Sequence, residues 1–176
     1  MNPLTTQNQT HEKTAILQWL ENAATPSTKP TDLFQRIVDL IHTKLPGYNW
    51  VGFYMIDPTD SSMLELGPFA GAATPHTRIP VSEGICGAAV AQGETVVVDD
   101  VNADPRYLSC SIETKSEIVV PIRAHGEIVG ELDIDSHTHA AFGSEDRAFV
   151  ERCAEIIGGY LESVSSLKTV AASISK

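Results

Sequence analysis

The sequence predicts an α+β domain in which helices cover one face of an antiparallel sheet and loops cover the other. Apolar residues recur at helical spacing near both ends of the chain, and stretches with strand character, separated by turn sequences, lie between them. We expect the loop-covered face to lie under the long segments 70–84 and 99–116. Because loops above a sheet commonly form small-molecule sites, functional residues are expected on that face.

Two helices are expected before the sheet. The first covers about residues 11–22 and has a narrow apolar side. Thr31 is the expected N-cap of the second helix, which should end before Pro46 because the residue before a proline disfavours helical geometry. The second helix has apolar residues at i, i+3, i+4 and i+7, which predict one buried stripe: Phe34, Ile37, Val38 and Ile41.

The central part of the chain has the pattern of two hairpins and a short helix. The stretches WVGFYMI and MLELGPF flank the turn sequence DPTDSS and predict the first hairpin. GICGAAVAQG predicts a short helix that ends at Gly93, and TVVV predicts a buried strand. EIVVPIRA and EIVGELDID predict the second hairpin, with its turn at His125 and Gly126.

A long final helix is expected after the second hairpin. Ser144 is its expected N-cap, and its buried stripe should contain Phe149, Cys153, Ile156, Ile157, Tyr160 and Leu161. We therefore expect a flexible N-terminal tail over residues 1–9, a single domain over residues 10–165, and a C-terminal tail over residues 166–176.

The charge and the apolar content argue against a nucleic acid partner and against a membrane span. The formal net charge is -11 at pH 7 with only 12 Lys and Arg residues, and they form no basic cluster, so we expect no nucleic acid partner. No apolar run approaches the roughly 20 residues that span a membrane, and the N-terminus lacks the features of a secretory signal. These observations predict a cytoplasmic protein whose three cysteines are free thiols rather than a disulfide framework.

Acidic residues alternate with apolar ones in the stretch ELDID. Side chains of a strand alternate between its faces, so the two apolar residues enter the core while Glu131, Asp133 and Asp135 share the other side. A solvated strand face explains this pattern, and so does a carboxylate cluster under loops, which Glu117 on the neighbouring strand would join. Clustered carboxylates repel unless a cation or a proton joins them. Such a cluster would therefore bind an ammonium group or supply a general acid.

The same segment continues as SHTH and adds two imidazoles to the acids. Carboxylates and imidazoles are metal ligands, but Asp133, Asp135, His137 and His139 match no ligand spacing with a known geometry. A solvated loop is the preferred interpretation. We expect no metal site and no cofactor.

The three cysteines differ in their sequence surroundings. Cys153 lies on the apolar stripe of the last helix, where a buried and inert thiol is expected. Cys86 lies at the start of the short helix, where backbone N–H groups would lower a thiol pKa, although burial as a small apolar residue explains it equally well. Cys110 lies among polar residues ahead of a strand, where packing gives no reason for a thiol, and is the best candidate for a nucleophile.

These cysteines and acids together resemble the free methionine-R-sulfoxide reductase family, whose members are stand-alone GAF domains. The resemblance covers about residues 50–158. Its motifs are GICGAAV with Cys86, DVNADPRYLSCSIETKSEIVVPI with Cys110 and Glu117, and GELDIDSHTHAAF with Asp133 and Asp135. It implies a GAF-like fold with an antiparallel sheet, helices on one face and loops covering the other.

The resemblance also implies roles for the cysteines. Cys110 would attack the sulfoxide sulfur, and Cys86 would be the second thiol that forms a disulfide with the resulting sulfenic acid, although the family leaves Cys86 open as the attacking thiol. Thioredoxin would then reset the site by thiol–disulfide exchange. Many family members carry a third cysteine two residues before the arginine of an R-I-P segment, and His76 stands there in this chain. Recycling therefore requires either Cys86 or direct attack of the reductant on the sulfenic acid.

The resemblance places the substrate between acids and aromatic rings. Glu117, Asp133 and Asp135 would hold the amine and the oxide of the substrate, while Trp50 and Tyr54 would wall the pocket around its methyl and sulfur. Oxygen must leave as water, so the oxide needs a proton from a carboxyl group whose pKa is raised.

The expected function is therefore the thiol-dependent reduction of free L-methionine (R)-sulfoxide to L-methionine. The family resemblance suggests a cytoplasmic homodimer. The alternative is a GAF module that binds a small ligand as a sensor, without catalysis, and a metal-dependent hydrolase built on the Asp/His cluster is a further alternative.

Overall fold

The computed structural model describes residues 3–109 and 111–174 of the chain, and the side chains of residues 7–109 and 111–166. Cys110 lies outside the described residues. The elements are, in order, α1 (Pro3–Ala23), α2 (Pro30–Lys44), β1 (Trp50–Asp57), β2 (Asp60–Ala70), β3 (Arg78–Pro80), α3 (Gly84–Gln92), β4 (Val96–Val98), the 3₁₀ turn η1 (Val101–Ala103), β5 (Ser116–Ala124), β6 (Glu127–Ser136) and α4 (Ser144–Ile174).

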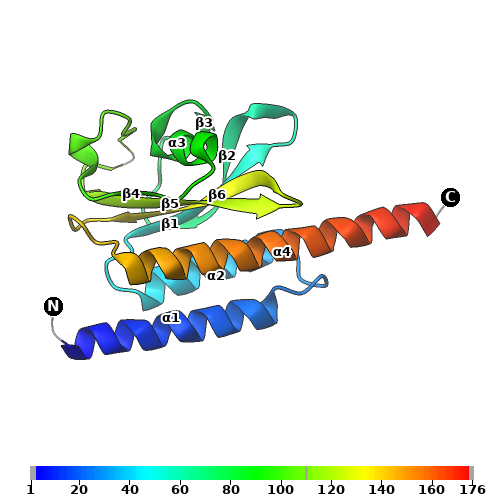
Figure 1. The fold of residues 1–176 in the computed structure, drawn as a ribbon, viewed down its shortest axis with the longest axis horizontal. Helices are drawn as coiled ribbons and strands as arrows, with labels where there is room; N and C mark the ends of the chain where they lie inside the picture. Colours follow the sequence, from blue (N-terminus) through cyan, green and yellow to red (C-terminus); the bar gives the residue numbers. More distant parts are fainter. Residues whose placement is uncertain (1–2, 110, 175–176) are drawn as a thin grey trace.

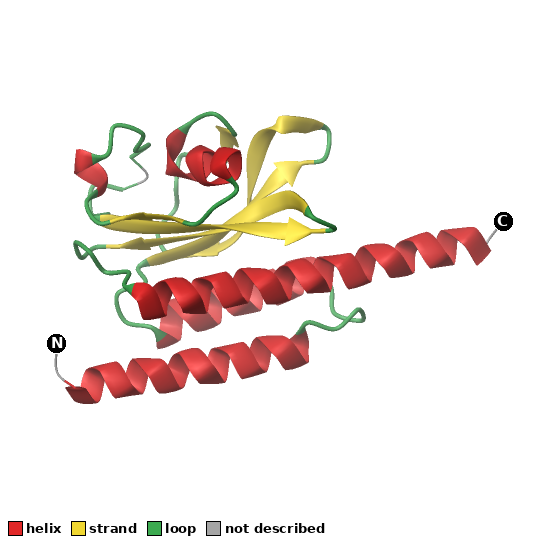
Figure 2. Cartoon of the chain, viewed as in Figure 1, coloured by secondary structure: helices red, strands yellow, loops and turns green. Residues whose placement is uncertain are grey.

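The strands form one antiparallel sheet with the order β3-β2-β1-β6-β5-β4. Helices α2 and α4 pack on one face of this sheet, and α1 packs on those two helices (Figure 1). The short helix α3 and the long loops lie over the other face, as the colouring by element makes clear (Figure 2). The α+β fold class with helices on one face is therefore confirmed.

The core between the sheet and the helices has the predicted periodicity. The α2 stripe is buried throughout, and the strands that face it contribute alternate residues, so that one strand residue in two packs against a helix. On β6 these residues are Leu132 and Ile134, and on β5 they are Ile118, Val120 and Ile122. The α4 stripe is also as expected, although Ile156 and Leu161 are only partly buried.

Several predicted element ends were wrong. Helix α1 begins at Pro3 and α4 continues to Ile174, so helix occupies most of the described part of both expected tails. Helix α2 begins at Pro30 with Lys29 in the N-cap position, two residues before the expected cap at Thr31. Proline has no N–H to satisfy and has its φ preset, so it starts a helix without a side-chain cap.

The start of α4 also differs from the expectation. Ser144 is the first helical residue rather than the cap that precedes the helix. The Asp146 carboxylate accepts a hydrogen bond from the Gly143 N–H at 2.9 Å, and so satisfies a donor at the helix start. Asp146 also accepts hydrogen bonds from Lys13 and Tyr48, which ties α1 and the end of the α2–β1 loop to α4.

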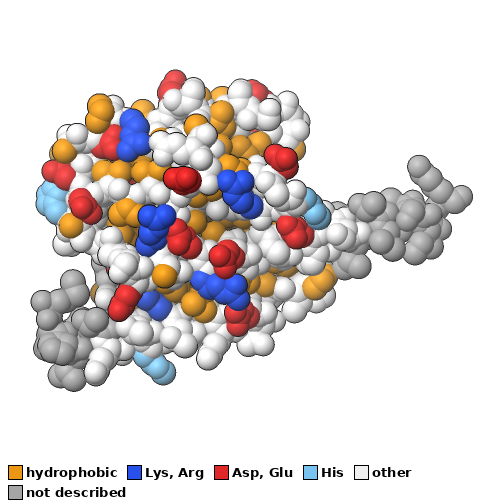
Figure 3. Space-filling view, viewed as in Figure 1, with side chains coloured by type: hydrophobic (Ala, Val, Ile, Leu, Met, Phe, Trp, Pro, Cys, Tyr) orange, Lys and Arg blue, Asp and Glu red, His pale blue; other side chains and the backbone are white. Residues whose placement is uncertain are grey.

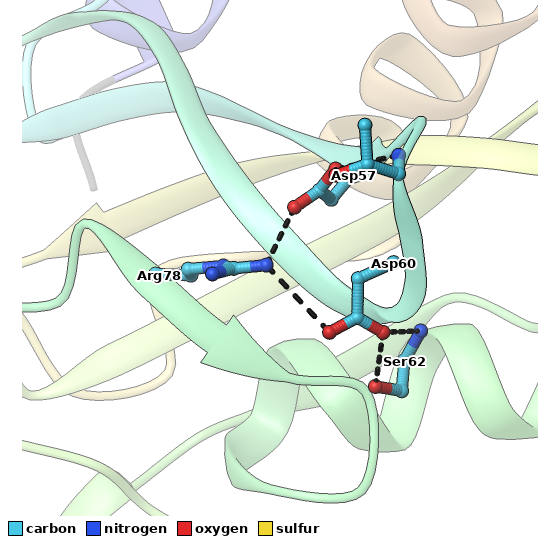
Figure 4. Close-up of polar contacts among 5 residues, drawn as sticks. Asp57, Asp60, Ser62 and Arg78 are labelled. Carbon is cyan, nitrogen blue, oxygen red and sulfur yellow. Dashed lines mark hydrogen bonds and ion pairs between the residues drawn. The ribbon is translucent and has the colours of Figure 1, made fainter.

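Strand β3 was not predicted, because it lies inside the segment expected to be a loop. It pairs with β2 through residues 78–80 and forms one edge of the sheet. Arg78 anchors it from the side: its guanidinium donates to Asp57 at 2.5 Å and lies 3.7 Å from Asp60 (Figure 4). The Asp60 carboxylate in turn accepts hydrogen bonds from Ser62. These contacts link β3 to the turn of the β1–β2 hairpin.

Charged side chains of both signs are mixed on the face of the molecule in Figure 3, where Lys and Arg lie next to Asp and Glu. Arg152, for example, pairs with Glu21 of α1 and Glu155 of α4. This face therefore has no extended basic surface for a polyanion. No helix within the described part of the chain combines the length and the apolar character needed to cross a membrane.

Candidate active site

Strand β6 places three carboxyl groups on the sheet face that α3 and the loops cover. All three residues are buried: Glu131 is 0% exposed, Asp133 is 3% exposed and Asp135 is 4% exposed. Glu117 of β5 lies directly across from Asp135 in the strand register and is 5% exposed. The interpretation of this strand face as solvated is therefore wrong. The four acids form a buried cluster, which we call the acid cluster.

Strand β1 pairs with β6 on the edge opposite β5, and two aromatic residues of β1 lie beside the acids. Trp50 lies across from Asp135, and Tyr54 lies across from Glu131. The indole N–H of Trp50 donates to the Ala72 carbonyl at 3.0 Å, and the Tyr54 hydroxyl donates to the His76 carbonyl at 2.7 Å. Both rings are thus fixed by the loop that leads to β3.

The position of the Trp50 ring depends on a glycine. The ring lies over Gly52, where an added Cβ would come within 2.2 Å of the indole. Gly52 is in register with Asp133, so the indole extends from the level of Asp135 towards that of Asp133. The glycine therefore allows the aromatic wall to lie flat beside the acids.

Helix α3 brings Cys86 onto the acid cluster. The thiol is buried and donates to the Asp133 carboxylate, with Sγ and Oδ2 separated by 3.7 Å. The Cys86 sulfur and one carboxyl oxygen each of Glu117 and Asp133 all lie within 4.8 Å of one another. Glu131 also interacts with this thiol. A residue from a short helix thus meets acids from two strands.

Burial and mutual repulsion control protonation in the cluster. Burial raises the pKa values of Glu117 and Asp133 well above their usual range, and neighbouring carboxylates raise them further. Burial raises the pKa of Glu131 to about 8 and that of Asp135 to about 7. The cluster therefore holds protons at neutral pH and has the properties of a general acid.

The surroundings of Cys86 do not favour a thiolate. Burial raises its pKa well above the usual value, and the charges of Glu131, Asp133 and Glu117 raise it further. The lowering expected from backbone N–H groups at the start of α3 is outweighed. Cys153 is fully buried in the helix-side core, and burial raises its pKa too, as expected for an inert thiol.

A pocket of about 370 Å³ opens beside the outer end of the acid cluster. Asp135 and Trp50 form part of its wall, and the loop before β3 forms another part. Thr114, which also lines the pocket, hydrogen-bonds to Asp135 and lowers its pKa against the effect of burial. Asp135 is thus the acid of the cluster that reaches this pocket.

The residues on either side of Cys110 lie at this site. The His76 ring lies 3.2 Å from the Ser109 carbonyl oxygen, and the Tyr107 hydroxyl donates to the Ser111 carbonyl at 3.3 Å. Ser111 also lines the pocket that contains Trp50 and Asp135. Cys110 itself lies outside the described residues, so its thiol has no described geometry.

The Asp/His grouping that was weighed against a solvated loop as a metal site does not come together among the described residues. His137 lies 3.8 Å from Glu113, and His139 lies 3.7 Å from Asp100, with both imidazoles substantially exposed. The grouping of Cys86 with Glu117 and Asp133 is closer. A proton already links two of its members, because the thiol donates to Asp133. We therefore describe it as a hydrogen-bonded acid cluster rather than as a metal centre.

A larger groove of about 750 Å³ lies on the helix side, between α4, strand β5 and residues 93–95 ahead of β4. Ion-paired side chains such as Arg147 and Glu151 line it. It contains none of the predicted site residues, so the smaller pocket is the candidate substrate site.

Two residues of the site were missed. Glu131 was placed on the correct strand face but outside the site, although its position two residues before Asp133 in the alternating stretch was a usable signal. Thr114 had no such signal, because its role depends on a contact with Asp135 across the loop.

Comparison with known proteins identifies the family. A model of the GAF domain family matches residues 29–161, most of the chain and all of the site residues. The crystal structure of the free methionine-R-sulfoxide reductase from Neisseria meningitidis, in complex with its substrate, aligns with a TM-score of 0.81 at 34% identity, over 88% of this chain and 91% of that chain. This chain belongs to the free methionine-R-sulfoxide reductase family of GAF domains.

Curated relatives support this family. Protein YtsP of Bacillus subtilis is 37% identical over 142 residues, which are 81% of this chain and 86% of that protein. The free methionine-R-sulfoxide reductase of Saccharomyces cerevisiae is 41% identical over 110 residues. Those residues are 62% of this chain and 61% of the yeast protein. The expected GAF-like fold is therefore confirmed for this free methionine-R-sulfoxide reductase family member.

Proposed function

We propose that the protein reduces free L-methionine (R)-sulfoxide to L-methionine with thiol chemistry. The observation that carries this proposal is the buried acid cluster, which borders an aromatic-walled pocket and retains protons at neutral pH. Related proteins named free methionine-R-sulfoxide reductases support the choice of substrate.

The substrate is bound through its charge and its apolar end. Asp135 reaches the pocket wall and is suited to the α-ammonium group, because a carboxylate forms a charge-assisted hydrogen bond with it. Trp50 and Tyr54 supply an apolar surface for the methyl group and the sulfur. A peptide or acetylated amine lacks the ammonium charge and would leave Asp135 unpaired, so the free amino acid is preferred.

Cys110 is the proposed nucleophile. Its thiolate attacks the sulfoxide sulfur, the sulfur–oxygen bond of the substrate breaks, and oxygen passes to Cys110 as a sulfenic acid. A protonated carboxyl of the acid cluster supplies the proton that the oxygen takes up, and methionine leaves with the electron pair on sulfur. The cysteine is oxidised by two electrons and the substrate is reduced by two. The raised pKa of Cys86 argues against Cys86 as the attacking thiol.

The sulfenic acid is returned to the thiol by an external dithiol, for which thioredoxin is the proposed reductant. Either Cys86 forms a disulfide with Cys110 first, or the reductant attacks Cys110 directly. His76 does not offer a third thiol here. We further propose a cytoplasmic location and a homodimer, for which light scattering on the purified protein is the test of the oligomeric state.

One assay tests the proposed function. The protein is incubated with racemic free methionine sulfoxide, thioredoxin, thioredoxin reductase and NADPH, and methionine and the remaining epimer are measured. We expect loss of the R epimer only, and little turnover of N-acetylmethionine sulfoxide at the same concentration. Binding of the free sulfoxide without methionine formation would instead favour the sensor module. Equal rates on free and acetylated substrates would contradict the ammonium-binding role of the acids.

A further inference from the structure

The Cys86 thiol has one proton and three acidic neighbours: Glu117, Glu131 and Asp133. The thiol donates to Asp133, at a Sγ to Oδ2 distance of 3.7 Å. Glu131 interacts with the same sulfur and is 0% exposed, yet within the described part of the chain neither of its carboxyl oxygens has a partner in hydrogen-bond geometry. The thiol therefore satisfies one oxygen of Asp133, whereas Asp133 Oδ1 and both oxygens of Glu131 have no such partner among the described residues.

Protonation of Glu131 resolves this arrangement. A buried carboxylate without hydrogen bonds is costly, whereas a neutral carboxyl is an O–H donor that can direct its proton to the Cys86 sulfur. The Cys86 sulfur then accepts a hydrogen bond from Glu131, and the Cys86 thiol donates one to Asp133. The three groups form a hydrogen-bond chain in which every donor points towards Asp133. The pKa of Glu131, raised by burial to about 8, agrees with a neutral carboxyl at pH 7.

The three acids of β6 lie at increasing depth. Asp135 reaches the pocket, Asp133 lies two residues further along the strand, and Glu131 lies two residues beyond that, completely enclosed. The proton of Glu131 thus faces the interior of the cluster rather than solvent. The titratable groups that surround it from α3, β1, β5 and β6 are Cys86, Tyr54, Glu117, Asp133 and Asp135.

We propose that Glu131 stores the proton used in sulfoxide reduction and delivers it to Asp133 through the Cys86 thiol. This inference rests on the proposed function and adds two positioning residues to it. Glu131 acts through its neighbours and needs no contact with the substrate. In this arrangement Cys86 serves as a proton carrier and remains a thiol during the transfer.

The transfer balances in protons and electrons. In one concerted step, Asp133 gives its proton to the departing sulfoxide oxygen, the Cys86 S–H bond breaks towards Asp133, and a new S–H bond forms with the proton from Glu131. Asp133 and Cys86 therefore remain protonated, and Glu131 becomes the carboxylate. Reduction of the Cys110 sulfenic acid by two external thiols releases a disulfide, water and one proton as the Cys110 thiolate is restored. That proton is taken up by the Glu131 carboxylate, which becomes neutral again.

The variant Glu131→Gln tests whether Glu131 stores the proton. Glu127→Gln is the control, because Glu127 is an exposed acid on the same strand. The readout is the rate of methionine release in a single turnover, at saturating free methionine R-sulfoxide and without reductant, across a pH range. We expect the wild-type rate to fall as pH rises through about 8, where Glu131 loses its proton. Glu131→Gln should lower the rate at neutral pH about ten-fold or more and remove this alkaline fall, with substrate affinity unchanged. An alkaline fall retained in Glu131→Gln, or a wild-type rate in this variant, would overturn the proposal.

Two Cys86 variants test the carrier. Cys86→Ser keeps a group that both accepts and donates a proton, whereas Cys86→Ala keeps none. In the same single-turnover assay, Cys86→Ser should retain most of the wild-type rate of methionine release. Cys86→Ala should release methionine as slowly as Glu131→Gln. Equal rates in the two Cys86 variants would contradict a proton-carrying role.

A spectroscopic measurement on the wild-type protein is independent of activity. The S–H stretching band of Cys86 is identified in the infrared spectrum by its loss in Cys86→Ser, with the Cys153 band as an internal reference. We expect the Cys86 band to shift between about pH 6.5 and about pH 9.5, because Glu131 titrates between them. An unshifted band would reject the Glu131–Cys86 link even if the protein reduces the sulfoxide. A shifted band in a protein without reductase activity would leave the link in place and reject the proposed function instead.

Discussion

Cys153 and Cys86 are both buried, but they have different neighbours. Cys153 packs among apolar side chains of the helix-side core, whereas Cys86 lies against carboxyl groups. A thiol among apolar side chains contributes only packing, while a thiol among acids takes part in their protonation. The third thiol, Cys110, is the proposed nucleophile.

Cys110→Ser should abolish methionine release in a single turnover without reductant. A serine hydroxyl is a far weaker nucleophile towards a sulfoxide sulfur, and it cannot form the sulfenic acid. Cys153→Ser is the matched control: it should retain activity and lose about 1–3 kcal/mol of unfolding free energy, since a buried hydroxyl replaces a thiol. Methionine release by Cys110→Ser would transfer the nucleophile role to Cys86.

Asp135→Asn should weaken recognition of the free amino acid. The side chain reaches the pocket, and its charge would pair with the α-ammonium group. Loss of a hydrogen bond to a charged group costs about 1.5–3 kcal/mol, so we expect kcat/KM to fall about ten-fold or more. Steady-state kinetics on free methionine R-sulfoxide measure this, with Glu127→Gln as the control. If both variants showed the same kcat/KM, Asp135 would have no part in binding the amine.

Helix α4 and strand β5 lie close together at Gly158. A Cβ on Gly158 would lie 2.1 Å from the Arg123 carbonyl oxygen, whereas a Cβ on Gly159 would have no neighbour within 4 Å among the described residues. The helix packs on the sheet backbone at this point without an intervening side chain. The next residue along the helix therefore provides a matched control.

Gly158→Ala should destabilise the fold by about 1–3 kcal/mol, because the helix must move away from the strand to admit a methyl group. Gly159→Ala should instead stabilise it by about 0.5–1 kcal/mol, since alanine favours a helix more than glycine does. Urea unfolding curves of the two variants measure both effects. Equal unfolding free energies would show that α4 does not pack on β5 as described.

The packing of α3 and of the loop before β3 also explains the electrostatics of the site. Strand alternation alone leaves the acid face of β6 open to solvent, and α3 with the β3 loop closes it. Desolvation by these two segments is the largest cause of the raised pKa values. Carboxyl groups with raised pKa values thus result from covering a strand whose own sequence is compatible with exposure.

At the scale of the whole molecule, the acid cluster links stability to pH. Between the ordinary carboxyl pKa and the raised one, the native state binds more protons than the unfolded state, so stability falls as pH rises. For Glu131 this window extends from about 4.5 to about 8, and for Asp135 from about 3.8 to about 7.

The melting temperature of the substrate-free protein should therefore decrease between about pH 5 and about pH 9. Glu131→Gln should show a smaller decrease, because its amide has no proton to lose. Differential scanning calorimetry of both proteins across this range gives the measurement, and Glu127→Gln should follow the wild type. Parallel pH profiles for wild type and Glu131→Gln would show that Glu131 is not neutral in the native state.

Local periodicity in the sequence was sufficient for most of the elements. The α2 stripe, the two hairpins and the turn at His125 and Gly126 follow from patterns within a few residues, and the structure confirms them. Strand β3 was not predictable in this way, because three residues carry no period and its pairing with β2 is made across the loop of residues 71–77.

The sequence by itself determined which residues share a face of β6, because alternation is a property of the strand alone. It also contained the motifs that identify the family. Only the tertiary structure decided that those acids are buried, and that Cys86 contacts Asp133 across 47 residues of chain. Burial and pKa depend on segments that are distant in sequence and meet only in the fold, so an acid on a strand keeps its proton at neutral pH only after α3 and the loops exclude water from it.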